Sequence, residues 1–110
     1  MPLDFSTITH VLLSCSNLHS ISDLLLEIAG RCNITVIRTT KGFSTLSINS
    51  GEFFIHVFYS REQETLNSIS IVNVHSGKQV SVMDGISCDG FNALANTLEH
   101  LRLINKRSVA

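Results

Sequence analysis

The chain has 110 residues, enough for one hydrophobic core and too few for two ordinary domains, so we expect a single domain over residues 1–110. Hydrophobic residues make up 44% of the sequence and charged residues 15%, a balance that excludes a disordered chain. The formal net charge is −1 and like charges form no blocks, which disfavours general nucleic-acid binding. With so few charges, part of the surface is expected to be covered by a second copy or by another protein.

The three cysteines, Cys15, Cys32 and Cys88, are widely spaced and odd in number. They form no CxxC pair and have no histidine at metal-ligand spacing, so the pattern predicts free thiols rather than disulfides or a zinc site. No positively charged segment precedes the first apolar run, and no apolar run approaches about 18 residues. We therefore expect no signal peptide, no membrane contact and a cytoplasmic protein.

Two helices are predicted in the N-terminal part of the chain. Leu3–Cys15 carries apolar residues at helical spacing, and Asp4 is placed to cap the first turn, although the β-branched residues of this segment also fit a strand. Asn17–Ser20 interrupts the pattern. A second helix is predicted to begin with Ser20 as its cap and to end at Gly30, and its apolar stripe requires a sheet face to cover it.

Three strands are predicted next, at Ile34–Thr40, Phe43–Asn49 and Glu52–Ser60, separated by Lys41-Gly42 and Ser50-Gly51. The third strand is rich in β-branched and aromatic residues and is apolar on both faces, so we place it in the middle of a sheet. Two-residue loops whose second residue is glycine are typical of tight hairpin turns.

Tight turns would determine how these three strands pair. The expected pairs are Thr40–Phe43, Arg38–Thr45 and Val36–Ser47 at the first turn, and Asn49–Glu52, Ser47–Phe54, Thr45–His56 and Phe43–Phe58 at the second. Because side chains alternate across a strand, this register sorts them into two faces. The core face, which the helices are expected to cover, consists of Ile37, Leu46, Ile48, Phe53, Ile55, Val57 and Tyr59. The other face, called the mixed face here, consists of Ile34, Val36, Arg38, Phe43, Thr45, Ser47, Phe54, His56 and Phe58.

A second hairpin is predicted after a polar loop. The loop is Arg61–Asn67, with one helical turn as an alternative for Glu62–Leu66, and the strands are Ser68–Val74 and Gln79–Met83. A four-residue turn, His75–Lys78, would join them. It would place Ile69, Ile71, Val80 and Val82 on the core face, whereas Val72, Val74 and Met83 would extend the mixed face.

The last predicted element is a helix capped by Ser87 or Asp89 and ended by Asn105–Arg107. Its apolar stripe is Phe91, Leu94, Ala95, Leu98, Leu101 and Ile104. The expected fold class is therefore α+β: a two-layer sandwich in which two N-terminal helices and one C-terminal helix cover a five-stranded antiparallel meander.

The sequence predicts no catalytic residue, no metal site and no cofactor. No two of the five histidines stand at the spacing that holds a metal ion, and the carboxylates form no evident pair. His56 is either a pH-sensitive contact or a hydrogen-bonded core residue, and the second reading is favoured. Cys88 is either a reactive thiol before a helix or, as we favour, an ordinary loop cysteine.

The mixed face is the predicted partner-binding site, with Phe43, Phe54, His56, Phe58, Val36 and Arg38 as its residues, because interface cores favour aromatic residues and few charges. The predicted function is a non-enzymatic protein-binding module, such as an accessory, inhibitor or chaperone-like protein, that also self-associates. Two alternatives use other chemistry. A nucleic-acid-associated regulator would stack bases on the same face, aided by Arg102, Lys106 and Arg107, but Arg38 is the face's one predicted cation. An enzyme would need Cys88 or His56 in a cleft.

The layout of a helix, an antiparallel sheet and a closing helix over Ile21–Ile104 resembles the small bacterial type III secretion chaperones. The resemblance rests on this layout alone and implies a cytosolic dimer that binds partner proteins. Those proteins place a long helix between their third and fourth strands, and Arg61–Asn67 is too short for one. The predicted binding surface depends on the two glycine turns. Phenylalanine rings beneath a helix of the same chain, or a slipped pairing at either turn, would leave no recognition surface and would remove the functional hypothesis with it.

Overall fold

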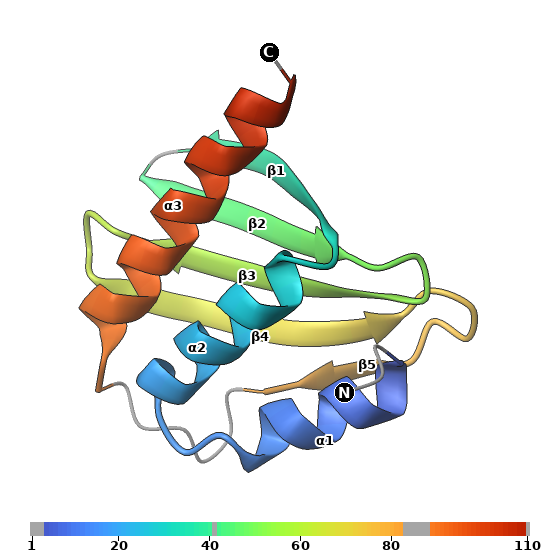
Figure 1. Ribbon diagram of the computed structural model, residues 1–110. Helices are drawn as coiled ribbons and strands as arrows, with labels where there is room; N and C mark the ends of the chain where they lie inside the picture. The colour runs from blue at the N-terminus through green and yellow to red at the C-terminus, as the bar shows by residue number, and fades with distance from the viewer. Residues whose placement is uncertain (1–3, 41, 83–88, 110) are drawn as a thin grey trace.

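The computed structural model describes residues 4–40, 42–82 and 89–109, with the side chains of residues 36–40 and 104–109 outside the description. The elements are α1 (Phe5–Ser14), α2 (Leu18–Ala29), β1 (Asn33–Thr40), β2 (Phe43–Asn49), β3 (Phe53–Ser60), β4 (Thr65–Asn73), β5 (Gln79–Ser81) and α3 (Phe91–Val109). The strands form one antiparallel sheet in the order β1-β2-β3-β4-β5. The predicted α+β fold with a five-stranded meander is confirmed. β3 is its central strand, and all three helices lie over the same side of the sheet (Figure 1).

The hydrophobic core lies between the sheet and this helical layer. Burial alternates along β3, where Phe53, Ile55, Val57 and Tyr59 are inaccessible to solvent and the residues between them are half-buried. The predicted core face is confirmed at these four residues and at Leu46 and Ile48, while the Ile37 side chain lies outside the described residues. The helices supply the other half of the core: Ile8, Leu12, Leu18, Ile21, Leu24, Leu25, Ile28, Leu94, Leu98 and Leu101.

The predicted turn between β2 and β3 is wrong by two residues. Asn49 pairs with Phe54 rather than Glu52, and the two-residue loop is Gly51-Glu52, closed by a 3.0 Å bond from Ser50 N–H to the Phe53 carbonyl. Gly51 has φ of 97°, so the glycine occupies the position of the turn that needs a positive φ, and Ser50 does not. The slipped pairing that was expected to remove the recognition surface thus occurs at this turn. Because side chains alternate with a period of two, a slip of two residues nevertheless leaves every residue of β3 on its predicted face.

The β1–β2 pairing follows the prediction as far as Arg38–Thr45 and then departs from it. A bulge between Val36 and Arg38 makes Val36 pair with Leu46 rather than Ser47. One extra residue in a strand exchanges the faces of all residues beyond it. Ile34 consequently packs against the core instead of lying on the mixed face, and Thr35 pairs with Ser47.

The loop between β3 and β4 is shorter than predicted. Residues 61–64 form the turn, Glu64 adopts a positive φ of 53°, and β4 begins at Thr65. No helical turn occurs there, nor is there room for the helix that type III secretion chaperones have at this place. The pairing shifts by one residue between Phe58 and Tyr59, where a bulge leaves Asn67 of β4 without a partner on β3.

The β4–β5 turn is also displaced, since Val72 pairs with Gln79 and a 2.8 Å bond from Asn73 N–H to the Lys78 carbonyl closes the loop. The predicted core residues of this hairpin are confirmed: Ile69, Ile71 and Val82 are buried and Val80 packs partly against them. Val72 is half-buried and Val74 is exposed. Met83 lies outside the described residues.

The helix caps agree only in part with the sequence. Asp4 caps α1 as predicted: its carboxylate accepts a 2.7 Å bond from Thr7 N–H, and that bond lowers the pKa of the carboxyl. α2 starts three residues before the predicted position, because Asn17 accepts the Ser20 N–H bond at 3.0 Å.

The third helix begins at Phe91, where the Gly90 carbonyl accepts from Leu94 N–H, and it continues to Val109, past its predicted end. Of the two caps predicted for it, Ser87 lies outside the described residues, and the backbone carbonyl of Asp89 accepts a bond from Leu18 N–H at 3.2 Å. Among the helices of the described residues, none has the length and apolar character needed to cross a lipid bilayer.

Candidate functional site

The side of the sheet opposite the helices has no described helix over it (Figure 1). We call it the open face and define it by strand register. Its described side chains include Asn33, Thr35, Phe43, Thr45, Ser47, Asn49, Phe54, His56, Phe58, Ser68, Ser70, Val72, Gln79 and Ser81. These side chains carry no formal charge at neutral pH with histidine neutral. The backbone of Arg38, whose side chain lies outside the description, pairs with Thr45 of this face.

A row of small polar side chains crosses the middle of the open face. Ser47 pairs with His56, His56 with Ser70 and Ser70 with Ser81, so one residue from each of four neighbouring strands lies in this row. The Ser47 hydroxyl and His56 Nδ1 are 3.1 Å apart and share a hydrogen bond. His56 is half-buried, so it is a hydrogen-bonded residue that still reaches the surface.

Aromatic side chains flank this row on both sides. Phe43 and Phe58 meet edge to face, with ring centroids 5.4 Å apart and an interplanar angle of 88°, a favourable aromatic geometry. Phe54 lies on the other side of His56, on the β3 position that pairs with Asn49 and Val72. All three phenylalanines are half-buried, so each keeps apolar surface in contact with water. The structure thus joins two of the predicted rings and separates the third from them.

An open hollow of about 400 Å³ lies beside Phe54. Thr35, Ser47, Asn49 and His56 form the rest of its lining, and Asn49 Nδ2 donates to Thr35 Oγ1 at 3.1 Å. Thr35 and Asn49 were not predicted as site residues. Thr35 reaches this place only because of the bulge in β1, which has no evident sequence signal.

Val36 and Arg38 were also predicted as site residues, but their side chains lie outside the description. Their backbones pair with Leu46 and Thr45. Of the predicted site, the structure therefore brings Phe43, Phe58 and His56 onto one face together with Phe54.

Metal ligands and thiols are the other reactive groups to consider among the described residues. Within the described residues, no group of three or more His, Cys, Asp and Glu side chains is arranged to hold a metal ion. Cys15 and Cys32 are half-buried free thiols, and burial raises the pKa of each, which reduces their reactivity. Cys88 lies outside the described residues.

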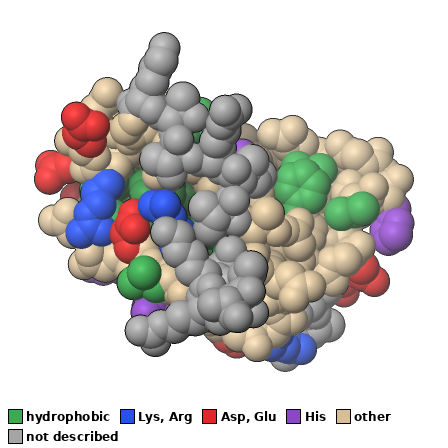
Figure 2. Space-filling model, turned by 90° about the horizontal axis from the view of Figure 1, so that it is seen from above, with side chains coloured by type: hydrophobic (Ala, Val, Ile, Leu, Met, Phe, Trp, Pro, Cys, Tyr) green, Lys and Arg blue, Asp and Glu red, His purple; other side chains and the backbone are tan. Residues whose placement is uncertain are grey.

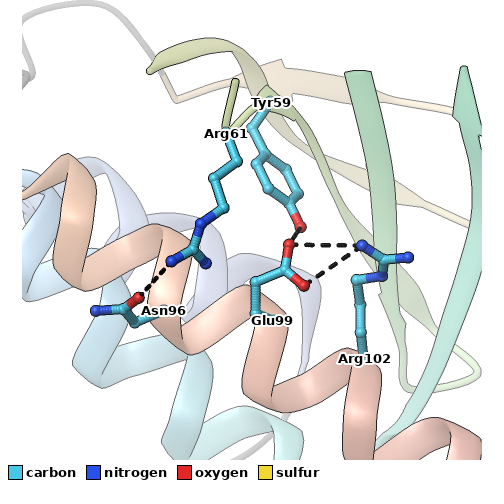
Figure 3. A network of polar contacts seen from close by, with 5 residues as sticks. All are labelled: Tyr59, Arg61, Asn96, Glu99 and Arg102. Carbon is cyan, nitrogen blue, oxygen red and sulfur yellow. Dashed lines mark hydrogen bonds and ion pairs between the residues drawn. The ribbon is translucent and has the colours of Figure 1, made fainter. Parts of the chain in front are cut away.

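A polar network ties α3 to the central strand on the helical side of the sheet (Figure 3). The Tyr59 hydroxyl donates to Glu99 Oε1 at 3.3 Å, and Arg102 Nη1 lies 3.4 Å from Glu99 Oε2. Beside it, Arg61 Nη2 donates to Asn96 Oδ1 at 3.2 Å. The Tyr59 ring is fully buried, so the network holds the helix on the sheet.

This network predicts an alkaline limit to stability. Burial raises the pKa of Tyr59, and the negative charge of Glu99 raises it further. An unfolded chain releases the tyrosine proton near about pH 10, whereas the folded protein still holds it there. The contribution of Tyr59 to the free energy of unfolding should therefore be complete below about pH 10 and decline as pH rises toward the higher folded-state pKa.

Tyr59 is the one tyrosine and the chain has no tryptophan, so near-ultraviolet tyrosinate absorbance follows this group alone. Urea unfolding of wild type and Tyr59→Phe at a series of alkaline pH values checks the linkage. The difference in unfolding free energy between the two should shrink as pH rises. A difference that stays constant with pH, together with titration at the ordinary tyrosine value, would contradict the burial of this hydroxyl.

No protein family, curated protein or solved structure matches this chain.

Proposed function

We propose that this protein is a non-enzymatic protein-binding module that acts through the open face, in the manner of an accessory, inhibitor or chaperone-like protein of the cytoplasm. One observation carries the proposal. The helices all lie on one side of the sheet, and the other side presents three half-buried phenylalanines among uncharged polar side chains.

Covering these rings would release water from apolar surface, which favours association by about 25 cal/mol per Å². The neutral hydroxyl and amide side chains around them lose less hydration than charges would on the same transfer. Aromatic residues with few charges are the usual composition of an interface core. A protein surface of similar character is therefore the partner that this face fits best.

Nucleic acid fits the face less well. Base stacking on exposed rings needs a positive field to hold the phosphate backbone. No described side chain of the open face belongs to Lys or Arg, and Arg38, whose backbone pairs with Thr45, is the single cation that the sequence predicts there. Arg102 pairs with Glu99 on the helical side. Where charged side chains gather, at the end of the molecule with the β3–β4 turn, acidic and basic groups lie side by side (Figure 2).

The proposal predicts that Phe54→Asp and Phe58→Asp keep the fold but abolish partner binding. A carboxylate would remain solvated in the free protein, yet it would be buried without a counter-charge in a complex. The expected loss is that of a hot-spot residue, about 2 kcal/mol or more, or at least about 30-fold in affinity. Capture of proteins from the source cell with tagged wild type and variants, followed by quantitative mass spectrometry, measures it.

Leu26→Asp is the matched control, because Leu26 is 43% exposed and belongs to α2 on the helical side. It should capture the same proteins as wild type, and circular dichroism should show all three variants folded. Capture that is equal for wild type, Phe54→Asp and Phe58→Asp would remove the open face as the binding site. Retention of single-stranded RNA by wild type at low salt, lost in the Phe54 variant, would replace the protein partner with nucleic acid.

A further inference from the structure

We draw no further inference here: the strongest candidate, the open hollow beside Phe54 on the open face of the sheet, belongs to the site already described, and nothing in the structure shows what would cover it.

Discussion

Phe53→Ala is expected to lower the free energy of unfolding by about 3–5 kcal/mol, the usual cost of removing a buried phenylalanine ring. Phe53 is completely inaccessible to solvent and is among the largest fully buried side chains of the core. Its ring lies on the helical side of the central strand, so its removal leaves a cavity between two layers. A loss of this size is a large part of the total free energy of unfolding of a small domain. Urea unfolding followed by circular dichroism measures the change.

Phe54→Ala is the matched control, because Phe54 is the next residue of the same strand and differs chiefly in the face to which it points. Its ring is half-buried and has no described helix above it, so we expect a loss of about 1 kcal/mol. The contrast between neighbours tests the two-sided character of β3. Equal losses at the two positions would mean that both sides of the sheet are covered within the monomer.

Gly90→Ala should be the second strongly destabilising change, by about 2–4 kcal/mol. Gly90 has φ of 91°, which strains any residue with a Cβ. An added Cβ would also lie 2.7 Å from His19 Cδ2 and 3.0 Å from the His19 backbone nitrogen. The imidazole can turn away, but the backbone nitrogen belongs to the first turn of α2 and cannot move without displacing the helix.

Gly77→Ala separates strain from contact. Gly77 also has a positive φ, of 76°, but a Cβ there would meet nothing within 4 Å. It should cost about 1 kcal/mol through backbone strain alone. Thermal unfolding of the two variants beside wild type makes the comparison. If Gly90→Ala is no worse than Gly77→Ala, the close approach of the α3 entry to α2 is absent in solution.

The sequence was sufficient to predict the two faces of the central strand. Alternation in Phe53–Tyr59 places every second side chain among apolar neighbours. A different turn leaves these faces unchanged if it shifts the pairing with the neighbouring strand by an even number of residues. The turn itself was predicted wrongly because Ser50-Gly51 and Gly51-Glu52 both put a glycine between two apolar runs. Only the backbone conformation distinguishes them: the observed loop keeps positive φ off the serine.

The candidate site was less predictable than the core. Without the bulge beside Val36, Ile34 would lie on the open side of the sheet. With the bulge, Ile34 lies opposite Ile48 and packs partly buried against the core. A regular alternating pattern contains no mark of such an insertion. The sequence also did not single out Asn17 as the cap of α2, because Ser20, three residues later, has the same capping chemistry.

Nuclear Overhauser contacts from the aromatic rings, measured in dilute, isotopically labelled protein, show directly which side of the sheet each phenylalanine occupies. We expect contacts from Phe53 to methyl groups of the helical layer, contacts between Phe43 and Phe58, and no contact from Phe54 or Phe58 to any helix. Contacts from the Phe54 or Phe58 ring to leucine methyl groups of α1, α2 or α3 would show that the chain covers this face itself, and would contradict a binding role for it.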